Sequence, residues 1–232
     1  MNKPAMKIGI LLAGHAPDML LAQTGDYGAI FSQLLGGHGF SFVAYDVVDM
    51  AFPDRIEACD GWLITGSRHG VYEDHPFIPP LEAFIRDAYA ADIPMVGICF
   101  GHQIIAQALG GKVEKFADGW AVGHQTYDWN GEPITLNAWH QDQVTQLPAQ
   151  AQVLASNDFC ANAALVYGKR AFSIQAHPEY DAVFMNGLVQ FRGPGLVPDA
   201  QLKQALADLD EPVDNSGIAA QMARFFKERI VA

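Results

Sequence analysis

One short segment constrains the architecture of this chain more than any other. An apolar run at residues 94–98 leads into Gly97-Ile98-Cys99-Phe100-Gly101, and an apolar, helix-like stretch follows at 103–109. This order predicts a strand, a sharp turn and a helix, with Cys99 at the apex of the turn. Glycines two positions on either side permit such a tight turn. A helix N-terminus presents unpaired N–H groups and a positive dipole end, which favour a thiolate over a thiol.

The first half of the chain alternates between strand-like and helix-like segments. Helices are expected where apolar residues recur at helical spacing, and strands where short apolar runs end in turn signals. The expected strands lie at 7–13, 40–47, 61–65 and 94–99, and the expected helices at 27–35, 77–88 and 103–109. Such alternation is typical of a parallel sheet with helices on both faces. We therefore expect an α/β fold with three layers around a mostly parallel central sheet.

The second half of the chain has a different pattern. From residue 112 to 176 the signals are mostly β, with strands expected at 134–139, 152–156 and 170–175. After residue 180 the pattern becomes helical, and apolar stripes of this kind indicate helix faces that cover a core. The two stripes are Leu202, Ala205, Leu206 and Leu209, and then Ile218, Met222, Phe225, Phe226 and Ile230. We expect a single domain over residues 1–232, with a helical C-terminal extension from about residue 181.

Composition and charge argue against several classes of protein. The formal net charge of −12 argues against a nucleic-acid partner, because phosphate binding needs clustered Lys and Arg. The N-terminal apolar run is too short for a signal peptide, and no segment approaches the ~20 apolar residues of a membrane span. Three widely spaced cysteines, Cys59, Cys99 and Cys160, do not form a disulfide framework. We expect a cytoplasmic protein without a membrane partner, in which Cys59 and Cys160 serve packing.

A base for the cysteine is found at Gln175-Ala176-His177-Pro178-Glu179, just after a strand-like run. In extended chain, residues two apart project to the same side, and proline holds the residue before it extended. Our hypothesis is that Cys99 attacks a substrate, His177 shuttles the proton and Glu179 orients His177. A cysteine in an apolar strand is more commonly a small buried hydrophobe. The conjunction of the glycine-flanked turn with a paired base and carboxylate favours catalysis.

These motifs resemble those of the class I glutamine amidotransferases, the glutaminase domains with a Cys-His-Glu triad. The resemblance covers roughly Ile8 to Tyr180. Thr65-Gly66-Ser67 falls where that family keeps a glycine-rich oxyanion loop after a strand. Trp139-His140-Gln141-Asp142 is similar to the family's Ser-His-x-Asp stretch beside the glutamine pocket. The resemblance implies a three-layer, flavodoxin-like sandwich and no cofactor.

The resemblance also implies an oxyanion hole. Backbone N–H groups of Gly66 or Ser67, and of Phe100, would stabilise a tetrahedral oxyanion. The loop reads Gly66-Ser67-Arg68, whereas the family often has Gly-Gly-Pro, so the choice of donors stays open.

Three further residues are implied as substrate contacts. Gln103, together with the backbone around Trp139 and His140, would hold the amino-acid end of the substrate. Taken alone, Gln103 could be an exposed helix residue and Trp139 could belong to the core.

Other polar groups are interpreted as loop residues. His69, Asp74 and His75 match no standard zinc spacing, so we predict no metal site. His15 and Asp18 follow the first expected strand, where ligands bind in open α/β sheets, yet loop positions are the favoured interpretation.

The leading functional hypothesis is cysteine-dependent hydrolysis of the γ-amide of glutamine or a γ-glutamyl small molecule, through a γ-glutamyl thioester. About fifty residues follow Glu179, and the chain has no ATP-binding loop. The alternative is a glutaminase subunit that passes ammonia to a separate synthase chain. A non-catalytic binding module is a third hypothesis. In α/β-hydrolases the acid precedes the histidine by a long interval, whereas here it follows by two residues.

Overall fold

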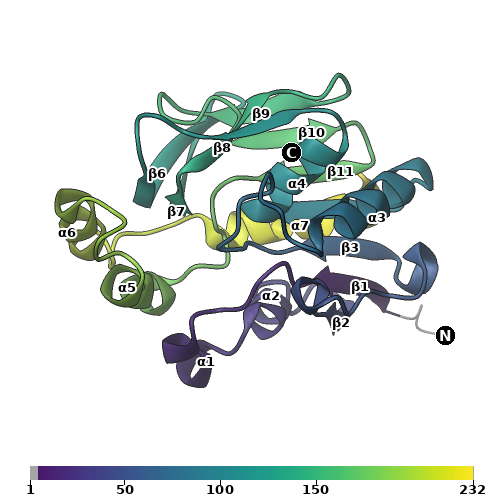
Figure 1. Cartoon of the computed structure of the whole chain (residues 1–232), viewed down its shortest axis with the longest axis horizontal. Coiled ribbons are helices and arrows are strands. Elements are labelled where there is room, and N and C mark those ends of the chain that lie inside the picture. Colours follow the sequence, from purple (N-terminus) through teal and green to yellow (C-terminus); the bar gives the residue numbers. More distant parts are fainter. Residues whose placement is uncertain (1–4, 232) are drawn as a thin grey trace.

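A nine-stranded sheet organises the chain (Figure 1). The computed structural model describes residues 5–231. The strands are β1 (Met6–Leu11), β2 (Phe40–Tyr45), β3 (Gly61–Ile64), β4 (Met95–Ile98), β5 (Lys112–Lys115), β6 (Ala121–Trp129), β7 (Glu132–His140), β8 (Asp142–Gln146), β9 (Gln152–Ser156), β10 (Ala164–Tyr167) and β11 (Ala171–Ile174). The α-helices are α1 (Asp18–Thr24), α2 (Tyr27–Leu34), α3 (Ile78–Ala90), α4 (Phe100–Ala108), α5 (Ala182–Phe191), α6 (Asp199–Ala207) and α7 (Asn215–Glu228). Two 3₁₀ turns are η1 (Val47–Asp49) and η2 (Ile56–Ala58).

The strand order in the large sheet is β2-β1-β3-β4-β11-β10-β9-β6-β7. The pairings from β2 to β11 are parallel, and those from β11 to β7 are antiparallel. Strand β11 lies late in the sequence but inserts beside β4, because Ala171–Ile174 pairs in parallel with Met95–Ile98. Strands β5 and β8 form a separate two-stranded sheet.

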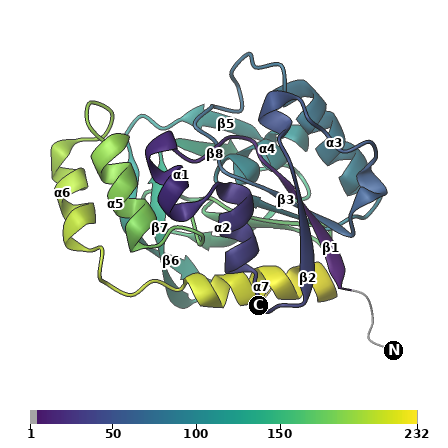
Figure 2. The same ribbon diagram turned by 90° about the horizontal axis from the view of Figure 1, so that it is seen from below.

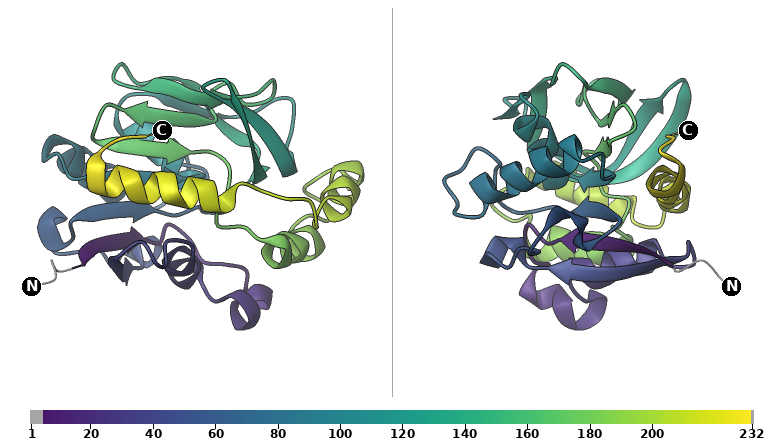
Figure 3. Two further views of the ribbon diagram at one scale, coloured as in Figure 1. Left: turned by 180° about the vertical axis from the view of Figure 1, so that it is seen from behind. Right: turned by 90° about the vertical axis from the view of Figure 1, so that its right-hand side faces the viewer.

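Helices cover both faces of the parallel strands (Figures 2 and 3). On one face, Phe31 of α2 and Phe225 of α7 pack into a core with β1 and β11. On the other face, Phe84 of α3 and Ile104 of α4 pack with the opposite side chains of β1 and β3. Every residue of β3 and β4 is buried, as expected for parallel strands covered on both sides. The α/β sandwich expected from the sequence is confirmed.

Two residues of the expected helical stripes lie outside the core, so those parts of the prediction were wrong. Leu206 is 41% exposed, because α6 buries only Leu202 and Ala205. Ile230 is 43% exposed, because α7 ends at Glu228 and Ile230 follows it. The remaining stripe residues of α7 are buried against the sheet.

Three further features concern the helices and the cysteines. Within residues 5–231, no helix is both long and apolar enough to cross a bilayer. All three cysteines are free thiols and buried. Cys59 and Cys160 sit in separate hydrophobic clusters on the two faces of the sheet, which agrees with their assignment to packing.

Helices α1, α5 and α6 gather to one side of the parallel strands (Figure 2). Helix α1 packs on α5, and α6 packs on both α5 and β6. Helix α5, together with the loops that follow β1, β3 and β4, lines a cavity at the C-terminal ends of the parallel strands. Ligands bind at this end of open α/β sheets.

Candidate active site

Cys99 occupies a sharp elbow between β4 and α4. Its backbone has φ 52° and ψ −102°, a conformation that L-residues rarely adopt and that costs about 1–3 kcal/mol. Glycine is required at positions 97 and 101, because other backbone atoms lie so close that a side chain would have no room. A Cβ on Gly97 would lie 2.4 Å from the Gly101 oxygen, and one on Gly101 would lie 2.2 Å from the Ile64 oxygen. The elbow thus seats a strained cysteine at the N-terminus of α4.

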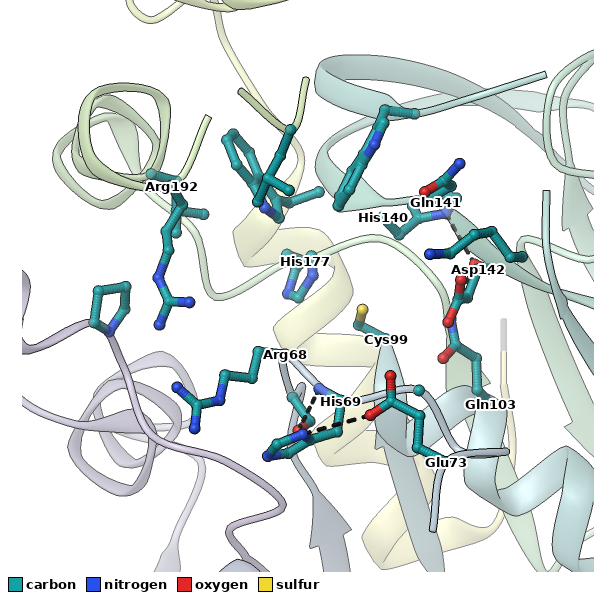
Figure 4. Close-up of a pocket in the computed structure, with 18 of the residues that line it drawn as sticks. Arg68, His69, Glu73, Cys99, Gln103, His140, Gln141, Asp142, His177 and Arg192 are labelled. Carbon is teal, nitrogen blue, oxygen red and sulfur yellow. Dashed lines mark hydrogen bonds and ion pairs between the residues drawn. The ribbon is translucent and has the colours of Figure 1, made fainter. Parts of the chain in front are cut away.

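His177 lies beside this cysteine (Figure 4) and forms a buried pair with Glu179. The His177 Nδ1–H donates to Glu179 Oε1 at 2.7 Å, and both side chains are almost completely buried. The backbone N–H of His177 donates to the Asn137 oxygen at 2.8 Å, which ties the loop after β11 to β7. An ideal Cβ on Gly66 would lie 3.2 Å from His177 Cε1 and 3.8 Å from Cys99 Cβ. Gly66, Cys99 and His177 therefore meet in one place.

The electrostatic environment keeps His177 protonated. Burial by itself lowers the pKa of His177, but the neighbouring Glu179 and Cys99 outweigh burial and raise this pKa to about 10. The imidazolium is therefore the dominant form at neutral pH. Its ring also stacks on Tyr180, with centroids 3.9 Å apart, and the Tyr180 hydroxyl lies 3.1 Å from that of Tyr27. These contacts fix the orientation of the ring.

The expected oxyanion loop follows β3 and faces Cys99. Among residues 5–231, the backbone N–H groups of Gly66, Ser67 and Phe100 have no hydrogen-bond acceptor. The neighbouring Gly101 N–H, in contrast, donates to the Thr65 oxygen at 3.1 Å. The Thr65 hydroxyl accepts a hydrogen bond from the Ala13 N–H, which anchors the loop to the end of β1. Three free donors thus border the site.

Gln103 belongs to a buried network of amides. Its Nε2 donates to the Asp142 backbone oxygen at 2.9 Å and to Gln175 Oε1 at 3.0 Å. The Gln175 Nε2 in turn donates to the Cys99 sulfur at 3.6 Å. Gln175 is fully buried and was not among the residues to which the sequence assigned a role. The sequence could have indicated Gln175, because it stands two positions before His177 and residues two apart in an extended chain project to the same side.

A cavity of about 370 Å³ opens beside Cys99. Trp139 and His140 line it from β7, and Gln103 of α4 and His177 after β11 line it as well, so the structure brings all the expected contact residues to one cavity. Burial and the charge of His177 lower the pKa of His140 to about 3, and this histidine is neutral at pH 7.

The loop between β3 and α3 forms another part of the wall. His69 and Glu73 line the cavity, and Glu73 Oε2 lies 2.8 Å from His75 Nε2 and 3.6 Å from His69 Nδ1. It is Glu73, and not Asp74, that approaches the two histidines. His15 also lines the cavity and lies 2.6 Å from Asp26, whereas Asp18 is exposed on α1. His15 and His69 are loop residues, as the sequence interpretation had them, and both also lie in the wall of the cavity.

Comparisons with known proteins agree with this geometry. Residues 37–185, more than half of the chain, match the family "Glutamine amidotransferase class-I". Gamma-glutamyl peptidase 4 of Arabidopsis thaliana is 33% identical over 189 residues, which are 74% of this chain and 75% of that protein. The glutamine-hydrolysing GMP synthase of Azoarcus sp. (strain BH72) is 35% identical over 177 residues, which are 66% of this chain and 33% of that protein.

A solved structure supports the fold. The crystal structure of a glutamine amidotransferase from Thermotoga maritima has a TM-score of 0.75 and 20% sequence identity, and the match covers 97% of this chain and 99% of that one. The chain belongs to the class I glutamine amidotransferase family. Its enzyme class is that of an amidotransferase-like hydrolase.

Proposed function

We propose that the protein hydrolyses the γ-amide of glutamine or of a γ-glutamyl compound through a γ-glutamyl thioester. The observation that carries this proposal is that a strained cysteine and a protonated histidine line one cavity, with a buried carboxylate hydrogen-bonded to that histidine. The similarity to a plant γ-glutamyl peptidase supports the choice of a γ-glutamyl substrate.

In the first step, the Cys99 sulfur attacks the γ-carbonyl carbon and forms a C–S bond, while the carbonyl electrons move to oxygen. The free N–H groups of Gly66, Ser67 and Phe100 are the candidate donors to this oxyanion. His177 then donates its proton to the amide nitrogen, the C–N bond breaks, and ammonia or an amine leaves. The product is an acyl thioester on Cys99.

In the second step, water attacks the thioester. His177, now neutral, accepts a proton from that water, the C–S bond breaks, and glutamate and the thiolate are released. Glu179 stabilises the imidazolium that is present before the first step and that forms again in the second. Gln103, Trp139 and His140 are the candidate contacts to the amino-acid end of the substrate, because they line the cavity beside Cys99.

A comparison of isomeric substrates tests the proposal. The purified, reduced protein is expected to hydrolyse L-glutamine or γ-glutamyl dipeptides with a kcat/KM at least about 100-fold above that for the α-glutamyl isomers. A glutamine-like diazo ketone is expected to alkylate Cys99, as read by peptide mass spectrometry. Absence of turnover of every γ-glutamyl substrate by the fully reduced protein would contradict the proposal.

The similarity to one third of a GMP synthase favours a second candidate, a glutaminase subunit that delivers ammonia to a separate synthase chain. Such a subunit would be nearly inactive alone and would gain glutaminase activity with its partner. Rapid hydrolysis by the isolated protein therefore distinguishes the two candidates in favour of the first.

Replacing Glu179 by glutamine is expected to lower kcat on the order of 10²–10⁴-fold, because the amide neither stabilises the imidazolium nor fixes the tautomer. Glu179 helps raise the pKa of His177 to about 10, so its loss lets the imidazole proton leave at lower pH. The alkaline limb of the pH–kcat/KM profile should move to lower pH. Glu228→Gln, on the exposed side of α7, is the matched control. An alkaline limb that does not move would refute the assigned role of Glu179.

A further inference from the structure

Two arginines enter the cavity from different elements. Arg68 directly follows the oxyanion loop after β3, and Arg192 ends helix α5. Both line the cavity that contains Cys99 and His177. In Figure 4 their guanidinium groups approach the same region, beside His177.

Neither guanidinium has a partner within the protein. Among residues 5–231, no carboxylate lies within 4.0 Å of Arg68 or Arg192, and neither side chain donates a hydrogen bond. The chain carries a net charge of −12, so acidic groups are abundant and the absence of a partner here is informative. Arg192 is half-buried, whereas Arg68 is exposed, so the cost of an unpaired charge applies to Arg192. A partly buried charge without a counter-ion is costly, and an anionic ligand would offset that cost.

The cavity has two sides, one beyond Cys99 and the other beside His177. Gln103 and Asp142 lie on the far side of Cys99, and Arg68 and Arg192 lie on the side of His177 (Figure 4). The group that protonates the departing nitrogen must reach it within hydrogen-bonding distance. The leaving group therefore lies on the side of His177, which is the side with the two arginines.

We propose that Arg68 and Arg192 form a subsite for the carboxylate of the leaving group, and that the preferred substrates are γ-glutamyl amino acids or peptides rather than neutral γ-glutamyl amides. This inference rests on the proposed function and names its substrate class. Guanidinium groups bind carboxylates bidentately, with short, charge-assisted hydrogen bonds. A cavity of about 370 Å³ falls within the usual range of small-molecule sites.

The test uses substrates that differ in charge but not in shape. Initial rates are compared for γ-glutamylglycine and γ-glutamylglycinamide, and for γ-glutamylalanylglycine and its C-terminal amide, so that leaving groups of two lengths are covered. For at least one pair, kcat/KM of the acid is expected to exceed that of the amide about tenfold or more. This ratio should fall as salt is added, because arginine near solvent is screened.

Variants assign the effect to the two arginines. Arg192→Gln and Arg68→Gln are each expected to lower the acid-to-amide ratio about tenfold, and Arg192→Lys should retain part of it. Arg224→Gln, on the exposed surface of α7, is the charge-matched control and should leave the ratio unchanged. Each ratio compares two substrates on the same protein. A smaller amount of folded enzyme therefore lowers both rates equally and leaves the ratio unchanged.

The outcomes separate this subsite from the proposed function. If the acids and amides are hydrolysed equally, or the ratio survives both glutamine substitutions, the subsite is wrong and the hydrolase stands. If no γ-glutamyl substrate is hydrolysed, the proposed function fails and the subsite fails with it.

Discussion

Cys99→Ala is expected to lower kcat/KM for γ-glutamyl substrates by roughly 10⁴-fold or more, because covalent catalysis ends when the nucleophile is removed. Stability should change little, since alanine is also an L-residue and keeps the strained backbone of the elbow. The measurement combines hydrolysis kinetics with urea denaturation of the same preparation.

Cys59→Ala is the matched control, because Cys59 is another buried free thiol but lies outside the cavity. This control should retain hydrolysis close to that of the unchanged protein. A Cys99→Ala variant that keeps a substantial fraction of activity, with contaminating enzyme excluded, would show that another group carries the reaction.

Gly101→Ala is expected to destabilise the fold by at least about 3 kcal/mol. The added Cβ would lie 2.2 Å from the Ile64 backbone oxygen and 2.8 Å from the Ile64 carbonyl carbon. Both atoms belong to β3, a fully buried strand, so α4 must move away from the sheet. Because α4 begins directly after Cys99, the same movement should also reduce hydrolysis. Urea denaturation measures the first effect and steady-state kinetics the second.

Gly217→Ala is the control for this substitution. Gly217 lies in α7, has an ordinary helical φ, and a Cβ there would meet no atom within 4 Å. Alanine at such a position stabilises a helix by about 0.4–1 kcal/mol. If Gly101→Ala were as stable as Gly217→Ala, the close contact between α4 and β3 would not determine the shape of the elbow.

Local sequence patterns predicted the strands and helices of the first half well, because each pattern reports on neighbours in the chain. Strand β4, the turn at Cys99 and helix α4 follow from apolar runs and glycines that are contiguous. The pairing of His177 with Glu179 was also predicted, but for a different local structure: Pro178 and Glu179 form a turn, in which the Tyr180 N–H donates to the His177 oxygen, and not the extended chain that the sequence indicated.

Contacts between distant elements could not be predicted in this way. The link from Gln103 through Gln175 to the Cys99 sulfur depends on β11 pairing with β4, which no local pattern specifies. The stacking of Tyr180 on His177, and its hydroxyl contact with Tyr27, likewise depend on how α2 packs. No sequence pattern marks Arg192 as a cavity residue, because an arginine at the end of a helix is common in proteins of every class.

The topology has a consequence for synthesis on the ribosome. Strands β1 to β4 emerge early, but the edge of β4 is paired only when β11 arrives, and α7 covers their apolar face later still (Figure 3). A nascent chain that ends before residue 171 therefore offers the bare edge of β4 to other polypeptides, and one that ends before residue 215 still exposes the apolar face that α7 covers. Until β11 and α7 have both been made, such chains are prone to aggregate, and shielding of these two surfaces by a chaperone would raise the yield of native protein.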